Sequence, residues 1–487
     1  MRTERVKAGY LPGLHDDEVR WQVLTFEREG VRLEVSVPVL TAAQMQALAD
    51  RVRAAADKHL RTMTVAQIID VIDRVIARLL DRAHPVRRLA ETWLPVASGY
   101  DADMVRLGLT GYFKTFRAAQ LRRFVAEDFA NPAVLDGFQP TPKGGAVRAF
   151  GPDLLVHSWA GNVPALSLWS MVCGLLVKAP SIGKVASAEP LFAGWFAQQL
   201  AEVHPPLADC LAVVWWSGAG GDEADALYAR AETVLAYGGN LTLDALRKRL
   251  PVTTRFLPHG HKLGFGLIGA AALDSVKAPA VARLAAWDVM RYDQQGCYSP
   301  HVFYVERGGH VCPRAFADYL AAELANLERR FVRRALDLEE GAAVAKWQQS
   351  VEWRAPADAG QDLLIGPADA PWSVAYSDGL QPLVPTALYR TIAVVGVDRL
   401  DDVVPVVGAQ REYLQTAGIA AAPEELYRLA DLLGAAGVTR IAAIGSMSMP
   451  EAGWHHDGRF NLVDLVRMTE IEQSAEWAAQ PLALYAD

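Results

Sequence analysis

Strand-like and helix-like segments alternate between residues 150 and 270, and this alternation constrains the fold more than any other feature of the chain. Short apolar runs are separated by longer segments with helical periodicity. Because parallel strands need a helical crossover between them, the pattern predicts an open, mostly parallel sheet with nucleotide-binding capacity. The predicted strands are Leu154–Trp159, Ile182–Ser187, Leu211–Trp216, Thr233–Tyr237 and Leu263–Ile268, and the predicted helices are Ala165–Leu175, Leu191–Val203, Asp222–Arg230 and Leu241–Leu250.

The segments before this region predict a smaller N-terminal unit. Residues 20–40 predict a β-hairpin, because two apolar runs flank a polar turn that ends in Gly30. Helical periodicity follows, and residues 85–150 predict an irregular, mostly helical collar. The predicted elements are the strands Trp21–Phe26 and Val31–Val39 and the helices Ala42–Leu60 and Val65–Arg82.

The segments after residue 270 predict a second α/β unit and a tail. The second unit contains the helix Arg314–Leu327 and the late strand Thr391–Val397. The tail opens with the strand-like run Arg440–Ile444. A Gly/Ser/Pro-rich loop follows, and a last helix is predicted near Leu462–Ser474.

Composition excludes several classes of function. The chain has 487 residues, of which 51% are hydrophobic, so a large packed core is expected. A formal net charge of −8 argues against nucleic acid or an anionic membrane as the main partner. The N-terminal residues 1–7 have no apolar signal core. The cysteines form neither a metal-binding pair nor a dense framework, which predicts a reduced, cytoplasmic protein without a metal site. They are Cys173, Cys210, Cys297 and Cys312.

One apolar stretch imitates a membrane span. Residues Leu154 to Val177 contain no Lys, Arg, Asp or Glu, but they include His157, Asn162 and Pro164. Since a Gly-Asn-Val-Pro break interrupts the run, we interpret it as a buried strand, a loop and a buried helix.

Cys297 is the strongest candidate for a nucleophile. It follows the pair Gln295-Gly296 and precedes the apolar run Val302–Val305, a position that predicts an exposed thiol on the rigid edge of a strand. A thiolate attacks acyl carbonyls well, and the resulting thioester can be exchanged or reduced. The alternative is a buried structural cysteine.

Asn162 lies where the first predicted strand gives way to a helix. Its side-chain amide could donate to a developing oxyanion, together with the backbone N–H of the nucleophile. The alternative is a helix N-cap. The neighbouring His157 is interpreted as a structural hydrogen-bonding residue rather than a base.

Four further residues lie at positions typical of nucleotide binding. Lys178 and Lys184 lie near the next predicted strand, from which a lysine can reach a ribose or a phosphate, although a solvated lysine is the commoner case. Gly238 and Gly239 lie between a strand and a helix, where glycines let a pyrophosphate approach the backbone. The chain has no G-x-G-x-x-G pattern, so an ordinary Rossmann dehydrogenase is not supported.

Taken in order, these segments resemble the aldehyde dehydrogenase superfamily. Asn162-Val163-Pro164 is similar to its Asn-Phe-Pro oxyanion motif, and Lys184 through Leu191 is similar to its Lys-Pro-Ser-Glu-x-x-Pro-Leu cofactor segment, which includes Ser187. Gly238-Gly239 and Gln295-Gly296-Cys297 lie where the superfamily has its cofactor turn and its nucleophile.

Within that superfamily the chain most resembles the LuxC-type acyl-CoA reductases. The similar segments are Ala160–Pro164, Asp293–His301, Gly453–Gly458 and Asp464–Arg467. Two departures stand out. The stretch His261–Ile268 lacks the glutamate that activates water in hydrolytic members, and Ala387–Thr391 lacks the glutamate of the ribose-binding Glu-x-Phe-Gly-Pro segment. Without the first of these acids, hydrolysis of an acyl-enzyme should be slow.

The resemblance implies an α/β, aldehyde dehydrogenase-like fold with an open parallel nucleotide-binding sheet, a second α/β catalytic domain and a C-terminal tail. We expect an N-terminal hairpin with helices over residues 1–100, an NAD(P)-binding domain over 101–270 and a catalytic domain over 271–439. The tail, 440–487, is a candidate for bridging or oligomerisation. A homo-oligomer is expected from the same resemblance.

The function that follows is reduction of a fatty acyl thioester to an aldehyde through an acyl-Cys297 intermediate. The donor is acyl-CoA or a carrier- or protein-bound thioester, an acyl-activating enzyme is a candidate partner, and the cofactor is NADPH, with NADH as the alternative. Other hypotheses are a CoA-acylating aldehyde dehydrogenase and a cysteine acyltransferase without nicotinamide. The cluster His455-His456-Asp457 is interpreted as a structural loop rather than as a general acid or metal site.

Overall fold

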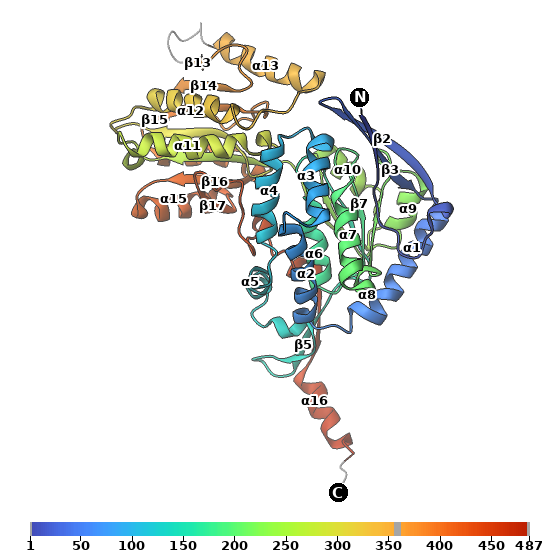
Figure 1. Cartoon of the computed structure of the whole chain (residues 1–487). Coiled ribbons are helices and arrows are strands. Elements are labelled where there is room, and N and C mark those ends of the chain that lie inside the picture. The colour runs from blue at the N-terminus through green and yellow to red at the C-terminus, as the bar shows by residue number, and fades with distance from the viewer. Residues whose placement is uncertain (1, 355–361, 485–487) are drawn as a thin grey trace.

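The structure is a computed structural model that describes residues 2–354 and 362–484 (Figure 1). The predicted N-terminal unit begins at residue 1 and the predicted tail ends at residue 487, and both of these residues lie outside the described range. Within it, no helix is both long and apolar enough to cross a bilayer. The stretch from Leu154 to Val177 forms a strand, a loop and a helix, as predicted.

A five-stranded parallel sheet forms the centre of the molecule, in the order β10-β9-β6-β7-β8. The chain runs from β6 outward through β7 and β8 and then returns to the other side of β6. The carboxyl ends of the neighbouring strands β6 and β9 therefore lie at the switch point, where α/β sheets bind ligands. The strands are β6 (Leu155–Ser158), β7 (Ser181–Lys184), β8 (Leu211–Val214), β9 (Thr233–Tyr237) and β10 (Arg255–His259).

The helices between these strands were all predicted within a few residues. They are α6 (Ser167–Leu176), α7 (Phe192–Val203), α9 (Asp222–Tyr228) and α10 (Asn240–Arg247), with the additional short helix α8 (Pro205–Ala208).

The fifth strand of this sheet is not the predicted one. Leu263–Ile268 is a strand (β11), but it belongs to a different sheet, and β10 takes the expected place. β10 is an edge strand with Pro258 in it, and only Leu257 of its residues is buried. A strand that buries so little has no apolar run to reveal it.

The second sheet has seven strands, in the order β13-β14-β15-β12-β11-β16-β17, and only β13 runs antiparallel to its neighbour. The predicted helix and strands of this unit are confirmed. The strands are β11 (Leu263–Ile268), β12 (Pro300–Glu306), β13 (Asp362–Ile365), β14 (Ser373–Asp378), β15 (Thr391–Val397), β16 (Leu414–Ala420) and β17 (Arg440–Ala443). The helices are α11 (Lys277–Met290), α12 (Pro313–Glu328), α13 (Leu338–Arg354), α14 (Val403–Gly408) and α15 (Pro423–Ala436).

The N-terminal hairpin is confirmed, and a further strand pairs with it. β2 (Arg20–Arg28) and β3 (Val31–Val39) are antiparallel, and β1 (Arg2–Lys7) runs parallel to β3. The helices that follow pack beside the five-stranded sheet (Figure 1). They are α1 (Ala42–Ala55), continued by a π-helical turn Ala56–Leu60, α2 (Val65–Leu80), α3 (Pro85–Ser98), α4 (Ala102–Lys114) and α5 (Ala118–Asp128).

The predicted last helix, Leu462–Ser474, is wrong. This segment contains the strand β18 (Arg467–Ile471), and α16 (Gln473–Ala479) follows it. β18 pairs antiparallel with β5 (Ala146–Phe150), which also pairs with β4 (Gln139–Pro140). The partner lies more than three hundred residues upstream, so local periodicity gives no sign of it. α16 extends away from the body of the molecule (Figure 1).

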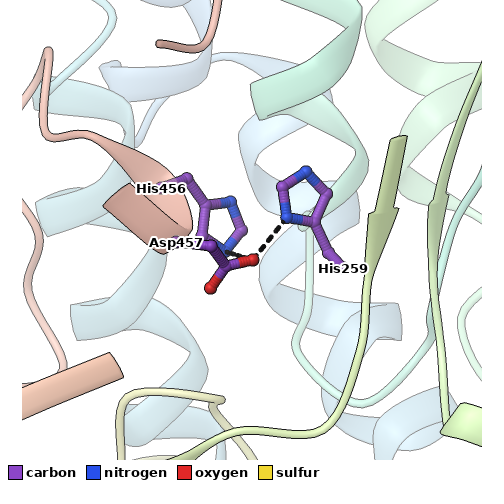
Figure 2. Close-up of side chains that lie close together, drawn as sticks. All are labelled: His259, His456 and Asp457. Carbon is purple, nitrogen blue, oxygen red and sulfur yellow. Dashed lines mark hydrogen bonds and ion pairs between the residues drawn. The ribbon is translucent and has the colours of Figure 1, made fainter. Parts of the chain in front are cut away.

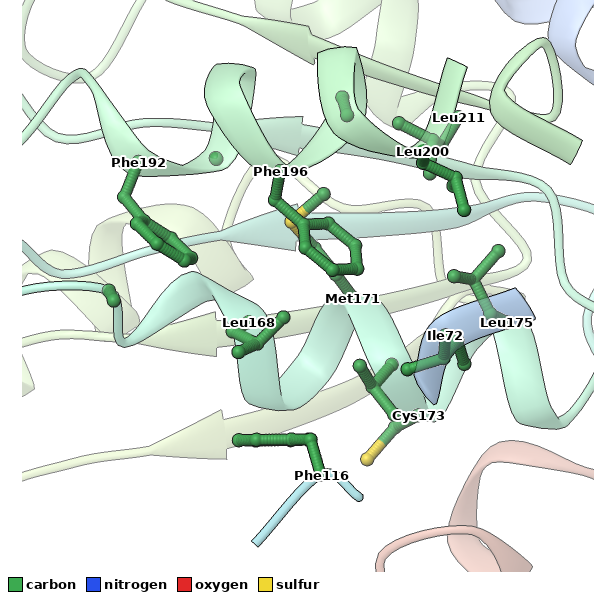
Figure 3. Close-up of a cluster of buried hydrophobic side chains, with 14 of the residues drawn as sticks. Ile72, Phe116, Leu168, Met171, Cys173, Leu175, Phe192, Phe196, Leu200 and Leu211 are labelled. Carbon is green, nitrogen blue, oxygen red and sulfur yellow. The ribbon is translucent and has the colours of Figure 1, made fainter. Parts of the chain in front are cut away.

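The largest hydrophobic core lies between the five-stranded sheet and the N-terminal helices. Figure 3 shows α6 and α7 contributing most of the side chains, including Leu168, Met171 and Phe196, each buried. Cys173 lies in the same cluster, which identifies it as a packing residue. This core holds the strands whose carboxyl ends form the candidate site.

Candidate active site

Cys297 lies where two cavities meet. One cavity is called the polar cavity because Asn, Gln, His and Lys side chains contribute to its wall. It encloses about 1110 Å³ including its open mouth, and its lining includes Asn162, Gly238, Gly239 and Cys297. The other is mainly apolar, encloses about 900 Å³, and also reaches Cys297. A group attached to this sulfur can therefore contact both compartments.

The loop that carries Cys297 has an unusual backbone. Tyr292, Asp293 and Gln294 all have positive φ angles, of 49°, 49° and 62°. Such a conformation is costly for residues with side chains and persists only where the surroundings enforce it. The enforcing contacts are buried. Arg390 donates to Asp293 at 2.7 Å, and the amide of Gln294 donates to the carbonyls of Pro300 and Thr391 at 2.8 and 2.9 Å.

The same contacts explain the second departure from the superfamily pattern. Arg390 lies in the stretch that lacks the ribose-binding glutamate, and its guanidinium also pairs with Glu328. Leu388, Tyr389 and Arg390 have positive φ as well. Arg390 therefore stabilises the loop that carries Cys297, through its contact with Asp293. Leu388, from the same stretch, lines the polar cavity.

The thiol of Cys297 is half-buried rather than exposed as predicted. Gln415 Nε2, at the start of β16, lies 3.5 Å from its sulfur. Burial raises the pKa of the Cys297 thiol to about 11, and the negative charge of Asp457 adds to the increase. The thiol is therefore protonated at neutral pH, and a nucleophile of this kind needs a base.

Asn162 faces the cysteine loop and does not cap a helix. Its side-chain Nδ2 donates to the backbone carbonyl of Gln295 at 2.5 Å, while Leu166 occupies the N-cap position of α6. The alternative interpretation as an N-cap is therefore wrong. The backbone carbonyl of Asn162 accepts a hydrogen bond from Tyr100 at 2.7 Å, which fixes the peptide that precedes Val163.

Gly238 and Gly239 connect β9 to the N-terminus of α10 and line the polar cavity. A Cβ atom at Gly239 would meet no atom within 4 Å, and one at Gly238 would meet only Thr242, at 3.7 Å. The backbone here is open to the cavity. It can accept a phosphate next to a helix N-terminus, where the partial positive charge favours an anion.

Lys184 and Ser187 lie at the carboxyl end of β7, outside the walls of both cavities. Burial lowers the pKa of Lys184. Ser187 Oγ accepts a hydrogen bond from Trp215 at 3.0 Å. Lys178, the alternative cofactor lysine, donates to Asp136 at 2.7 Å and is buried, which assigns it to structural support.

His157 is fully buried, stacks on Trp159, and has no hydrogen-bond partner for either ring nitrogen. Burial lowers its pKa to about 3. The predicted hydrogen-bonding role of His157 is therefore wrong, since neither ring nitrogen has a partner among the described residues. His157 lines neither cavity, which agrees with a structural role.

Three polar residues gather around the cavity of Cys297. The motifs of the sequence included neither His259 nor Gln415, and Asp457 was interpreted as part of a structural loop. His259 ends β10, Gln415 is the second residue of β16, and Asp457 belongs to the tail. Asp457 accepts a hydrogen bond from His259 Nδ1 at 2.8 Å (Figure 2). It accepts a second one from Gln415 Nε2 at 2.7 Å. Three separate segments bring them together, so no local motif contains them. The tail loop supplies a wall of the site rather than a distant structural element.

The apolar cavity runs from Cys297 to the helix α4. Gly108 and Gly111 of α4 line it. Aromatic and aliphatic side chains form most of the remaining wall, among them Tyr112, Val163, Leu166, Trp169, Tyr292, Met449 and Trp454. Such a lining favours a hydrocarbon chain over a polar ligand.

Comparison with known proteins shows relatives of one kind. The chain is 25% identical over 458 residues to the long-chain acyl-protein thioester reductase of Photorhabdus luminescens, covering 92% of this chain and 90% of the relative. It is 27% identical over 438 residues to the enzyme of the same name from Aliivibrio fischeri, covering 87% and 85%.

Solved structures show the same fold at lower identity. An indole-3-acetaldehyde dehydrogenase in complex with NAD⁺ aligns with a TM-score of 0.75 at 15% identity, covering 96% of both chains. The aldehyde dehydrogenase KauB from Pseudomonas aeruginosa gives the same TM-score, identity and coverage. The α/β fold is thus that of the aldehyde dehydrogenases. The family described as acyl-CoA reductase (LuxC) matches residues 60–468, most of the chain. The chain belongs to the LuxC family of acyl-CoA reductases.

Proposed function

We propose that this protein reduces a long-chain acyl thioester to the aldehyde through an acyl-Cys297 intermediate, with a nicotinamide nucleotide as the reductant. The observation that carries the proposal is the place of Cys297 at the junction of a polar and an apolar cavity. An acyl group on this sulfur would extend its chain into the apolar side and present its carbonyl to the polar side.

The polar cavity suits a dinucleotide. Gly238 and Gly239 would let the pyrophosphate approach the N-terminus of α10, and Lys184 and Ser187 would hold the adenosine end at the carboxyl edge of β7. When bound, the nicotinamide supplies the hydride that reduces the acyl carbonyl. A cationic Lys184 without an acidic ribose clamp favours NADPH, and NADH is the alternative.

Asn162 and the backbone N–H of Cys297 would stabilise the oxyanion that forms on the acyl carbonyl. A donor placed in this way contributes about 3–4 kcal/mol to lowering the barrier. The stretch His261–Ile268, which forms the strand β11 and the turn before it, holds no carboxylate to activate water. The acyl-enzyme would therefore persist until it is reduced.

The names of the relatives point to the acyl donor. The two relatives described above are acyl-protein thioester reductases, which supports a protein-bound thioester, and hence an acyl-activating partner enzyme, beside acyl-CoA. The helix α16, which follows β18 and extends away from the body, supports a homo-oligomer bridged by the tail. A CoA-acylating dehydrogenase would share the acyl-enzyme but run in the opposite direction, and an acyltransferase would need no nucleotide.

The test is aldehyde formation from tetradecanoyl-CoA and NADPH, with Cys297→Ala as the variant. Cys312→Ala is the matched control, because Cys312 is a free, exposed cysteine at the start of α12 and lies away from both cavities. The expected result is loss of aldehyde with Cys297→Ala alone and nucleotide binding retained by calorimetry. Substantial reduction by this variant would contradict the covalent route.

A further inference from the structure

An imidazole on the wall of the polar cavity, that of His259, is paired with a carboxylate. Asp457 Oδ2 is 2.8 Å from His259 Nδ1, and the two side chains are only 10% and 16% exposed (Figure 2). His259 comes from the end of β10, while Asp457 lies in the tail with a positive φ of 55°. The tail loop, which has this unfavourable φ at Asp457, thus places the Asp457 carboxylate next to His259 Nδ1.

The state of Asp457 determines which nitrogen of His259 carries a proton. Burial acts to raise the pKa of Asp457, but hydrogen bonds from His259 and Gln415 and the neighbouring imidazole of His456 hold it well below its usual range. An ionised carboxylate only accepts hydrogen bonds, so His259 Nδ1 is the donor. The lone pair of the neutral ring then lies on Nε2, the nitrogen not engaged by Asp457.

Three other imidazoles line this wall and are less suited to act as a base. The ring of His261 packs against the rings of His301 and Tyr413, burial lowers its pKa, and no carboxylate pairs with it among the described contacts. His301 Nδ1 accepts from the backbone N–H of Thr386 at 3.1 Å, so its proton must lie on Nε2. His456 stacks on His259, and burial lowers its pKa to about 3. Its Nε2 is 3.9 Å from Asp457, too far for a hydrogen bond. Among the described residues that line the cavity, His259 is the imidazole hydrogen-bonded to a carboxylate.

Gln415 connects this pair to the nucleophile. Its Nε2 lies 2.7 Å from Asp457 Oδ1 and 3.5 Å from Cys297 Sγ. An amide donates hydrogen bonds but does not take up a proton at neutral pH, so Gln415 can stabilise a thiolate without generating one. The base must be a different group.

We propose that His259 is the general base that deprotonates Cys297 during acylation, and that Asp457 is the residue that positions it. The proton moves from Cys297 Sγ to His259 Nε2 as the sulfur forms a bond to the acyl carbon. The bond between that carbon and the donor's sulfur then breaks, and the departing thiolate takes the proton from Nε2. The exchange needs no oxidant or reductant. The inference rests on the proposed function and deepens it.

The first experiment measures acylation alone, without nucleotide. Rapid-quench mixing with tetradecanoyl-CoA, followed by intact-protein mass, gives the acylation rate from about pH 5 to pH 9. The wild-type rate should rise with pH, because only the unprotonated imidazole can take the proton of the thiol. His259→Gln should lower the maximal rate by about 10²- to 10⁴-fold, with the half-saturating concentration of acyl-CoA unchanged. Asp457→Asn should also lower the maximal acylation rate, but by a smaller factor than His259→Gln.

His455→Gln is the matched control. His455 is the exposed neighbour in the same tail loop, packs against Phe460, and lines neither cavity. Its acylation rate should equal that of the wild type, which separates the function of the pair from a general disturbance of the loop.

A second measurement, the rate of thiol alkylation in Asp457→Asn, should change in the direction opposite to the acylation rate. It keeps the test valid if His259→Gln folds poorly. Asp457 raises the pKa of Cys297, so Asp457→Asn should make the thiol more acidic and speed its alkylation by iodoacetamide near pH 8. The same variant should slow acylation. A merely structural role for Asp457 would change both rates in one direction. The other charged or titratable groups around the pair and the thiol are Lys262, 4.0 Å from Asp457, and His456, Tyr237, Tyr298 and Arg440.

The outcomes separate this inference from the proposed function. Acylation of His259→Gln at the wild-type rate, with the pH profile unchanged, would overturn the assignment of the base and leave the acyl-enzyme intact. A wild-type protein that acquires no adduct from any acyl thioester would remove the proposed function and this inference together.

Discussion

The side-chain amide of Asn162 donates to the backbone carbonyl of Gln295, and the two atoms lie 2.5 Å apart. Gln295 is two residues before Cys297, so the amide that would bind an oxyanion already points at the nucleophile's loop. The carbonyl oxygen of Gln295 now accepts the hydrogen bond that the amide of Asn162 would donate to an acyl oxygen. An acyl oxygen that enters the site would have to replace it.

Asn162→Ala should therefore remove one oxyanion donor while leaving the fold intact. We expect the single-turnover rate of aldehyde formation to fall by about 10²- to 10³-fold. Asn131→Ala is a suitable control. Asn131 also hydrogen-bonds within a loop, where its side-chain oxygen accepts from the backbone N–H of Ala133 at 3.1 Å, but it lines neither cavity. An unchanged rate in Asn162→Ala would exclude this residue from the oxyanion site.

Gly111→Leu should shorten the preferred acyl chain. Gly111 lines the apolar cavity from α4, and a Cβ atom there would meet no atom within 4 Å, so the new side chain would occupy cavity space without strain. Each methylene group that loses its place costs about 0.8 kcal/mol of binding, or roughly a fourfold loss of affinity. The ratio of kcat/KM values for tetradecanoyl- and octanoyl-CoA measures the change.

Gly434→Leu provides the comparison for this variant. Gly434 is an exposed helical glycine of α15 whose Cβ would likewise meet no atom within 4 Å. It should leave the chain-length profile unchanged. A Gly111→Leu profile identical to that of the wild type would mean that the acyl chain follows another route.

Lys184→Ala should raise the KM for NADPH by roughly ten- to hundredfold, since a charge-assisted hydrogen bond contributes about 1.5–3 kcal/mol. Lys178→Ala should instead lower the free energy of unfolding, because it leaves Asp136 without its ion-pair partner. Steady-state kinetics and urea unfolding separate the two effects. A rise in KM confined to Lys178→Ala would place the nucleotide on a different segment.

Glu189 should make stability depend on pH. Burial raises the pKa of its carboxyl from 4.5 to about 7, against the hydrogen bonds from the N–H groups of Phe192 and Leu191 that act to lower it. A carboxyl with a raised folded pKa favours the folded state fully below pH 4.5, and that contribution is lost as the pH rises to about 7.

Glu189→Gln removes this loss. Relative to the variant, the wild type should lose up to about 3 kcal/mol of unfolding free energy between pH 4.5 and pH 8. Denaturant titrations at the two pH values measure it. Glu223→Gln is the control, because Glu223 accepts from a backbone N–H at the start of α9 but belongs to an exposed contact. Parallel pH dependence of wild type and Glu189→Gln would contradict the argument.

Sequence reasoning predicted the fold well where the signal is local. The β-α alternation, the loop of Asn162 and the loop of Cys297 each lie within one continuous segment, and the structure brings Asn162, Gly238, Gly239 and Cys297 to one cavity. Buried strands such as β9 and β11 show as apolar runs, which is why their limits were predicted to the residue.

The errors share a different cause. The edge strand β10 buries little, and β18 forms only because β5 lies beside it, so neither has an apolar pattern of its own. His259, Gln415 and Asp457 come from three segments that meet only in the folded protein. No spacing in the sequence connects them, and the tail was therefore interpreted as structural.

The central claim is that Cys297 carries the acyl group between donor and hydride. Intact-protein mass after mixing with tetradecanoyl-CoA tests it most directly, first without nucleotide and then with NADPH. The predicted result is a gain of one acyl group, mapped to Cys297, that disappears on addition of NADPH as aldehyde appears. An adduct on another residue, or one on Cys297 that persists with both NADPH and NADH, would contradict the claim.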